Sequence, residues 1–404
     1  MTAGETIPQP PAGAPAPDDA MPRSPGILFT AFEPSGDDHA SIVIAEIKRR
    51  RPDLPIFAWG GPKMEAAGAT VIERTGDDAV MGVPGLEKIR EHRRINKRIA
   101  DWLDANPVAL HVPVDSPAAN FPICKLARKR GIGVVHVVAP QLWAWGSWRV
   151  RKLRKRTDLV LCLLPFEEKW FAQRQVPARF IGHPLFDVNL DTAALDAAAA
   201  AFPEGSPRIT LLPGSRPGEL KQNFPLLLEA FSTLRRRHPD MVGVLAATRP
   251  EVVDHLRTLA QELGGWPDAL ETVVQQTDAA IRWADLALAV SGTVTLQVAR
   301  QRTPMVIVYK SNPVMYALLG WWIIDTELFA LPNLIAGKEV VPELIPHFGD
   351  AKAIIDAADR LLTSPDLMQA QALALNDIVS SFEGHSAGSD AADAILEKLD
   401  AIRS

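Results

Sequence analysis

Cysteine is scarce in this chain, with only two among 404 residues. Cys124 and Cys162 lie in apolar surroundings, and neither belongs to a cluster with the spacing of a metal site. This scarcity excludes a small fold built on disulfides. It favours two buried, reduced thiols in a cytosolic protein.

Long apolar segments are also lacking. The longest run, Pro313 to Ile324, has about twelve residues and falls short of the roughly 20 that a membrane-spanning helix needs. Residues 1–26 are rich in Pro, Ala and Gly and lack the apolar core of a signal peptide. We expect a disordered tail there, with Met21 as an alternative to Met1 as the natural start. The sequence therefore predicts a soluble or peripheral protein.

The chain also lacks a net positive charge, and its formal charge of −5 argues against general nucleic-acid binding. Cations nevertheless gather in three runs of the N-terminal half: Lys88, Arg90, Arg93, Arg94, Lys97 and Arg98; Lys125, Arg128, Lys129 and Arg130; and Arg149, Arg151, Lys152, Arg154, Lys155 and Arg156. Such runs are either solvated helix faces or a surface for anionic lipid headgroups or a phosphorylated substrate. Candidate interfacial anchors are the tryptophans Trp102, Trp148, Trp170, Trp321 and Trp322. The apolar neighbours of the last two favour a lipid-facing patch.

Strand-like apolar runs alternate with helical patterns along two stretches of the chain. The first stretch contains Ile27–Phe32, Pro55–Trp59, Val108–Val114, Val134–Val138, Leu159–Leu163 and Arg179–Ile181, with helices predicted over 38–50 and 121–130. The second contains Ile209–Leu212, Val242–Ala246, Glu271–Val274, Leu286–Val290 and Met305–Tyr309, and the last fifty or so residues are helical in pattern. This alternation is typical of parallel sheets covered by helices.

The length of 404 residues and a hydrophobic fraction of 47% predict two domains, each with a sizeable core. We expect an α/β protein with two doubly wound, Rossmann-like domains that face a central cleft. The expected divisions are a tail over 1–26, an N-terminal domain over 27–185, a connector over 186–207 and a C-terminal domain over 208–375. Helices over 376–404 would complete the chain, in a position to pack back on the N-terminal domain.

Two loops in the second half carry the clearest chemistry. Gly214, Ser215 and Arg216 follow one predicted strand, and Ser291, Gly292 and Thr293 follow another. Small residues between a strand and a helix let backbone N–H groups approach an anion, and Arg216 adds a planar, fixed positive charge. This pair of loops predicts a site for the diphosphate of a nucleotide sugar. Glu219, on the helix that follows Arg216, is either an acid in the first helical turn or a substrate contact.

An ordered set of nine motifs extends this interpretation: EPSGD at 33–37, GGPKM at 60–64, VMG at 80–82, PQLWAW at 140–145, LPFE at 164–167, IGHP at 181–184, LPGSR at 212–216, SGT at 291–293 and LPNLIAG at 331–337. Together they closely resemble the lipid-A-disaccharide synthases, which are inverting glycosyltransferases of the GT-B type. The resemblance runs from about residue 27 to 345.

The resemblance implies a reaction and its participants. The donor would be UDP-2,3-diacylglucosamine and the acceptor 2,3-diacylglucosamine 1-phosphate, with UDP and a β-1,6-linked disaccharide 1-phosphate of lipid A biosynthesis as products. No metal or other cofactor is expected, and no clear Asp-x-Asp segment stands on a donor loop. The leaving diphosphate would then be stabilised by amides and Arg216. The expected location is the cytoplasm, in peripheral contact with the inner membrane, and a homodimer that exchanges C-terminal segments is compatible with the helical tail.

Asp115, at the end of a predicted strand, matches the first Asp of the family's D-A-P-D-F-N motif. The resemblance implies that it is the base that takes the proton from the acceptor 6-hydroxyl. Without the resemblance, an Asp in a loop close to Pro117 would be interpreted as a residue that caps the loop. Asn120 matches the motif's Asn, with the role of orienting Asp115 or the acceptor. Further candidate site residues, without defined roles, are Ser35, Gly36, Asp37, Asn333 and Glu343.

Two departures from the family pattern leave alternatives open. Gln297 stands where the family has a Glu suited to the ribose hydroxyls, and Ala118 and Ala119 replace the motif's second Asp and its Phe. A related GT-B enzyme with a different lipid acceptor, such as a paralogue, remains possible on these residues, as does a non-catalytic protein that binds a UDP-sugar or lipid. His183 is interpreted as a structural residue at the domain crossing, and His39 replaces a usual aliphatic residue without an assigned role.

Overall fold

The computed structural model describes residues 25–75, 86–311 and 326–404, without the side chains of residues 86–89. Three sequence predictions therefore lie outside the described residues. They are the disordered tail as far as residue 24, the VMG motif at 80–82 and the lipid-facing patch at Trp321 and Trp322, while the last residue of the predicted tail, Gly26, begins β1.

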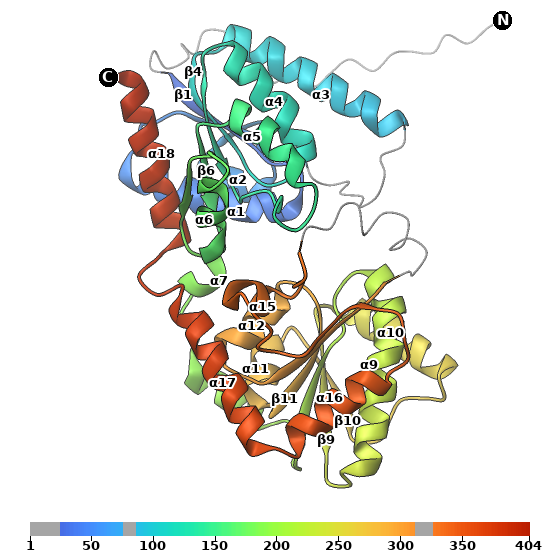
Figure 1. Cartoon of the computed structure of the whole chain (residues 1–404). Helices are drawn as coiled ribbons and strands as arrows, with labels where there is room; N and C mark the ends of the chain where they lie inside the picture. Colours follow the sequence, from blue (N-terminus) through green and yellow to red (C-terminus); the bar gives the residue numbers. More distant parts are fainter. Residues whose placement is uncertain (1–24, 76–85, 312–325) are drawn as a thin grey trace, which may run out of the picture.

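Two parallel sheets, each doubly wound with helices, organise the chain (Figure 1). The first sheet has the strand order β3-β2-β1-β4-β5-β6-β7. Its strands are β1 Gly26–Thr30, β2 Ile56–Gly60, β3 Thr70–Arg74, β4 Val108–Pro113, β5 Gly133–Val137, β6 Leu159–Cys162 and β7 Ala178–Phe180. Its helices are α1 Pro34–Arg50, α2 Pro62–Ala66, α3 Leu86–Ala105, α4 Pro117–Lys129, the short 3-10 helix η1 Ser147–Arg149, α5 Val150–Arg156 and α6 Pro165–Ala172. The central strands are fully buried, as expected of a parallel sheet that helices cover on both faces.

The second sheet has the order β10-β9-β8-β11-β12-β13. Its strands are β8 Arg208–Leu212, β9 Val242–Ala247, β10 Leu270–Val274, β11 Leu286–Val290, β12 Met305–Lys310 and β13 Glu343–His347. The helices around it are α8 Thr192–Ala199, α9 Pro217–Arg237, α10 Pro250–Glu262, α11 Thr277–Trp283, α12 Val294–Arg300, α15 Leu331–Ala336, α16 Lys352–Leu362 and α17 Pro365–Ser380. The predicted α/β architecture with two doubly wound sheets is confirmed.

Two strands escaped the sequence prediction for a physical reason. β3 alternates exposed and half-buried residues at the edge of its sheet, so it lacks the continuous apolar run of a central strand. β13 is an edge strand of only intermediate burial that contains Pro346. The segment expected to be a connector over 186–207 contains α8, which packs on α11, and overlaps the end of α7, Pro184–Asp187.

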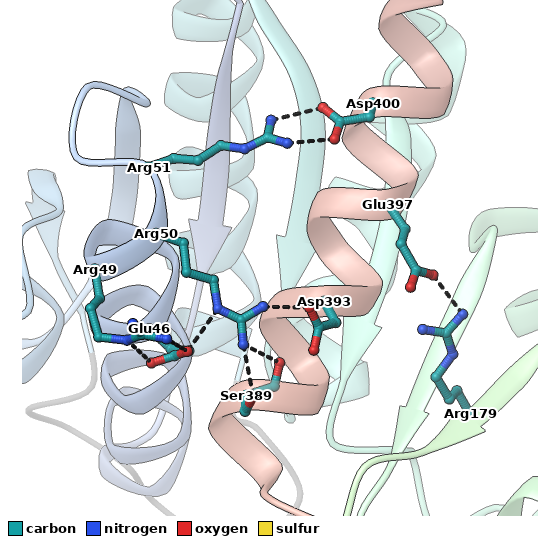
Figure 2. Close-up of polar contacts among 9 residues, drawn as sticks. All are labelled: Glu46, Arg49, Arg50, Arg51, Arg179, Ser389, Asp393, Glu397 and Asp400. Atoms are coloured by element: carbon teal, nitrogen blue, oxygen red, sulfur yellow. Dashed lines mark hydrogen bonds and ion pairs between the residues drawn. The ribbon is translucent and has the colours of Figure 1, made fainter.

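The last helix, α18 Ala387–Arg403, leaves the second sheet and packs on the first (Figure 1). Its apolar face joins the core of the N-terminal domain through Ala391, Ala392, Ile395, Leu396 and Leu399. Its acidic residues form ion pairs with Arg50 at the end of α1, with Arg51 just after it and with Arg179 of β7 (Figure 2). By contrast, α17 packs on α12, α15 and α16 of the second domain. The expected division at residue 375 therefore falls inside a continuous helix, and the chain returns to the first domain only after Ser380.

Among the helices that the structure describes, none combines the length and the apolar character that crossing a membrane requires. Both cysteine thiols are free and buried, and burial raises the pKa of the Cys124 thiol to about 12.

Candidate functional site

A cavity of about 720 Å³ lies between the two sheets, where their strands end. The N-terminal domain contributes residues that follow β1, β4, β5 and β6, and the C-terminal domain contributes residues that follow β8, β9 and β11. The carboxyl ends of both parallel sheets therefore open into one space, where ligands of doubly wound folds bind.

The loop between β8 and α9 forms one wall of this cavity with Gly214, Ser215 and Arg216. Gly214 has φ +94°, a conformation that residues with a Cβ rarely adopt. A Cβ at this position would also lie 3.3 Å from Oε2 of Glu219. The glycine thus allows the loop to turn sharply and place Arg216 immediately before the first turn of the 21-residue helix α9.

Arg216 and Glu219 form an ion pair on this wall, with 2.7 Å between Nη1 and Oε1. The arginine side chain remains 60% exposed, so its other donors are open to a ligand. Both residues line the cavity. Among the lining residues that the structure describes, Arg216 is the only lysine or arginine.

The loop between β11 and α12 forms the neighbouring wall with Ser291, Gly292 and Thr293. Open space surrounds Gly292, since a Cβ placed there would meet no atom within 4 Å. Gln297, one turn into α12, also lines the cavity. The two predicted anion-binding loops thus lie on adjacent parallel strands, β8 and β11.

Asp115 faces them from the N-terminal domain, two residues after the end of β4. Its backbone has φ +52° and that of Ser116 has φ +38°. Two successive residues other than glycine in this region store strain, which is typical of functional sites. The side chain of Asn120 holds this turn, because its Nδ2 donates to the carbonyl oxygens of Val114 at 3.1 Å and Asp115 at 2.8 Å.

The environment of Asp115 favours the protonated carboxyl. Burial raises its pKa above the ordinary range, and the nearby Glu33 carboxylate adds to the increase. The Ser116 backbone amide, His39 and the Ser35 hydroxyl act in the opposite direction. A raised pKa makes the carboxylate a better proton acceptor once it is ionised.

Two histidines lie on the same side of the cavity, with ring centroids 6.5 Å apart. Burial lowers the pKa of His39, and it lowers the pKa of His183 to about 4. His183 Nδ1 accepts a hydrogen bond from the Leu185 amide at 3.1 Å and caps α7. The neutral ring therefore carries its proton on Nε2. Capping α7 is a structural role, as expected for His183 at the domain crossing, and the residue also lines the cavity.

Ser35 lines the cavity, whereas Gly36 and Asp37 do not. Gly36 is buried, and a Cβ there would lie 3.1 Å from the Cβ of Ala31. The Asp37 carboxylate accepts hydrogen bonds from the amides of Gly61, Lys63 and Met64 at 3.0–3.1 Å. These contacts cap α2 and give Asp37 a structural role, while a contact of Gly36 or Asp37 with substrate stays a prediction.

Asn120, Asn333 and Glu343 also lie outside the cavity wall. Asn120 is fully buried and acts on the backbone of Asp115, which is one of the two roles predicted for it. Asn333 is fully buried and donates to Glu343 Oε2 at 2.9 Å, while Glu343 accepts from the amides of Phe329 and Ala330. These hydrogen bonds shape the 329–343 segment, and a role of Asn333 and Glu343 in substrate binding stays a prediction.

Sequence reasoning assigned no role to Glu33, Gln141, Trp145 or Glu167, and all four line the cavity. Glu167 is 2% exposed, and burial raises its pKa to about 7. It accepts hydrogen bonds from Trp143 Nε1 at 2.8 Å and from the Leu164 amide at 3.0 Å. Each of the four belongs to one of the nine motifs, so membership of a motif is the signal that could have identified them.

Among the described residues, no group of three or more His, Cys, Asp or Glu has the arrangement of a metal site.

Two doubly wound domains around a cavity at the ends of their strands define the GT-B fold. Solved structures with this fold include a UDP-N-acetylglucosamine 2-epimerase from Neisseria meningitidis bound to UDP-GlcNAc, with TM-score 0.57, 11% identity and coverage of 93% of this chain and 100% of that one. Another is the glycosyltransferase of kitacinnamycin, with TM-score 0.58, 18% identity and the same coverage. These likenesses concern the fold alone.

Sequence comparison defines the family. The model of the lipid-A-disaccharide synthetase family matches residues 27–391. The lipid-A-disaccharide synthase of Geobacter sulfurreducens is 34% identical over 349 residues, which cover 84% of this chain and 88% of that protein. The one of Alcanivorax borkumensis is 32% identical over 381 residues, which cover 94% and 98%. The chain belongs to the lipid-A-disaccharide synthase family of glycosyltransferases.

Proposed function

We propose that this enzyme transfers 2,3-diacylglucosamine from its UDP conjugate to 2,3-diacylglucosamine 1-phosphate. The products are the β-1,6-linked disaccharide 1-phosphate and UDP. The name that the relatives share, lipid-A-disaccharide synthase, supports a disaccharide of this kind as the product.

The observation that carries the proposal is the composition of the cavity. A strand-end carboxylate, Asp115, lies on the N-terminal side, and the two anion-binding loops lie on the C-terminal side of the same space. A transfer reaction needs a proton acceptor for the incoming hydroxyl and positive or N–H groups for the departing diphosphate. Residues of opposite domains are therefore candidates for both roles, and this supports the proposal.

The chemistry is a direct displacement with Asp115 as the base. The acceptor O6 attacks C1 of the donor sugar as the Asp115 carboxylate takes the hydroxyl proton. The bond between C1 and the diphosphate oxygen breaks, and its electron pair leaves with UDP. Attack from the face opposite the diphosphate inverts C1, and Arg216 with the amides of both loops stabilises the charge that develops on the leaving group.

The test measures UDP release by the purified chain from UDP-2,3-diacylglucosamine, with and without the acceptor, and determines the mass of the lipid product. UDP release that depends on the acceptor, together with a tetra-acyl disaccharide phosphate, supports the proposal. Donor binding without acceptor-dependent release would refute it.

A second candidate is a related enzyme with another lipid acceptor, or a protein that only binds a UDP-sugar or lipid. The observation that favours it is Gln297, which lines the cavity and offers one acceptor oxygen where a Glu would offer a charge. Ala118 and Ala119 support this second candidate less strongly than Gln297 does, because neither alanine lines the cavity. Q297E discriminates: tighter UDP binding with unchanged acceptor preference would assign Gln297 a role in donor affinity alone.

The proposed location is the cytoplasmic face of the inner membrane, where both acylated substrates would be met. A homodimer that exchanges C-terminal segments stays a prediction. In this chain α18 packs on its own N-terminal domain.

A further inference from the structure

The three basic runs of the N-terminal half differ in how far their charge is compensated. Arg98 of the first pairs with Glu73, and Lys97 pairs with Asp101. In the second, Arg128 pairs with Asp158 and Arg130 with Asp104. In the third, over 149–156, no cation pairs with a carboxylate of the part of the chain that the structure describes. This third run therefore carries uncompensated positive charge.

Helix α5 concentrates that charge, because its seven residues include five cations and no acid. Arg151, Lys152 and Lys155 are all exposed. Lys155 follows Lys152 by three residues and Arg151 by four, so it neighbours both on the helix surface. Leu153 is fully buried and anchors the opposite side of the helix.

Exposed tryptophans accompany these cations. Trp148 is 68% exposed, more than any other large apolar side chain in the described residues, and Trp145 is 47% exposed. Lys152 Nζ lies 5.5 Å from the Trp148 ring centroid, and the Arg149 guanidinium lies 4.2 Å from that of Trp145. Each exposed indole thus lies beside a cation of the third basic run, and together they form one short surface segment over 145–155.

This surface begins at the edge of the cavity, because Trp145 also lines the cavity wall. Whatever binds the tryptophans and α5 would therefore lie next to the entrance. We propose that Trp145, Trp148, Arg151, Lys152 and Lys155 form a docking surface for an anionic membrane. This deepens the proposed function by naming the side from which acylated substrates would enter.

The chemistry of the five residues favours a lipid surface over other polyanions. Indole rings settle at the headgroup level of a bilayer, where the apolar body and the N–H group both find partners. Lysine and arginine near an anionic leaflet each add about 1 kcal/mol, or roughly a fivefold gain in binding. A bare polyanion would use the cations but leave the exposed tryptophans without an apolar partner.

The experiment measures sedimentation of the full chain with vesicles of phosphatidylcholine alone or mixed with phosphatidylglycerol, without substrates. We expect binding only to the anionic vesicles. The triple variant R151Q/K152Q/K155Q should weaken it by on the order of 100-fold. The matched control, K221Q/R257Q/K338Q, removes the same charge from exposed cations of the C-terminal domain and should bind like the wild type.

A second pair of variants tests the tryptophan. W148A should weaken vesicle binding several-fold, whereas L373A, which removes a 61% exposed leucine from α17, should not. Equal losses in both triple variants, or equal binding to neutral and anionic vesicles, would overturn the proposal. Binding of the wild type to heparin but to neither type of vesicle would also overturn it.

The test separates this inference from the proposed function. With substrates dispersed in detergent, R151Q/K152Q/K155Q should keep the acceptor-dependent UDP release of the wild type, since none of the three side chains lines the cavity. If the wild type releases no UDP in detergent yet binds anionic vesicles through α5, the docking surface stands and the proposed reaction fails.

Discussion

Asp115 is the residue on which the proposed chemistry depends most. D115N keeps the size of the side chain and removes the proton acceptor, so turnover should fall by roughly 10²–10⁴-fold. Donor binding should persist, because the diphosphate loops lie in the other domain. Measuring UDP release beside the dissociation constant for UDP checks both statements, and unchanged turnover would exclude Asp115 as the base.

The pH dependence of turnover should reflect the surroundings of Asp115. Its pKa is raised by burial and by Glu33, and only the carboxylate can accept a proton. Turnover should therefore rise with pH through a limb that lies above the ordinary range of an aspartate. E33Q removes one of the raising charges while its amide oxygen can still accept from Ser116 Oγ. The limb of kcat/KM should move to lower pH in E33Q, and an unmoved limb would contradict this account.

Glu167 should make stability depend on pH. Its pKa is about 7 in the folded state and 4.5 ordinarily, so between these values the folded state binds more protons than the unfolded state. The free energy of unfolding should then decrease as pH rises from 4.5 to 7, by at most about 3 kcal/mol. Urea unfolding at both ends of this range measures the decrease. E167Q cannot ionise and should flatten it; an equal slope in wild type and variant would show that other groups cause the dependence.

The site illustrates what a sequence can and cannot predict at this scale. The loops at 214–216 and 291–293 line the cavity, and the sequence singled them out because small residues after an apolar strand let backbone N–H groups approach an anion. The structural contacts of Asp37 could not be predicted, because the sequence around a loop acid before a helix is the same whether the acid faces a ligand or three distant amides. Those amides come from Gly61 to Met64, which only the folded sheet brings near.

At the scale of elements, α18 shows which forces attach a helix to a distant domain. Arg50 pairs with Asp393, Arg51 with Asp400, and Arg179 with Glu397 (Figure 2). These pairs are partly exposed, and such pairs contribute about 0–1 kcal/mol each. The apolar face of α18, which includes the fully buried Ile395, outweighs them.

This difference gives a direct comparison of two truncations on one interface. I395A should cost about 2–5 kcal/mol in the free energy of unfolding, because it leaves a cavity in the core of the N-terminal domain. R51A, which removes both contacts to Asp400, should cost less than about 1 kcal/mol. Urea unfolding of the two variants at one pH provides the test, and a larger cost for R51A would reverse the ranking.

Most elements were predictable because a buried parallel strand is a continuous apolar run. Leu286–Val290 was predicted with the observed bounds, and its five residues are all buried. The edge strands β3 and β13 were not predicted, because one face of an edge strand meets solvent and its pattern resembles a loop. The attachment of α18 to the first domain depends on contacts between residues more than 300 positions apart, such as Arg50 with Asp393, and no local pattern encodes them.

At the scale of the whole molecule, one small apolar cluster bridges the two domains beside the cavity. Trp143 and Leu164 come from the N-terminal domain, and the fully buried Leu296 comes from α12. Leu331 and Leu334 of α15 pack against them. Gln297 follows Leu296 directly, and Glu167 accepts a hydrogen bond from the Trp143 indole. We therefore infer that this cluster helps to set how the proposed donor side and the proposed acceptor side face each other.

L296A should therefore affect both stability and turnover. Loss of the leucine should cost about 2–5 kcal/mol, and the loosened domain contact should lower kcat, since small misplacement of reacting groups costs up to about 10²-fold. The matched control is L227A on α9, whose leucine is also fully buried but lies in the core of the C-terminal domain alone. It should lose comparable stability and keep kcat at a temperature where both variants are folded. Equal kcat in L296A and L227A would mean that the bridge holds the domains together without positioning them, and the geometry of the cavity would then have to be fixed by the chain crossings at 181–187 and 381–387.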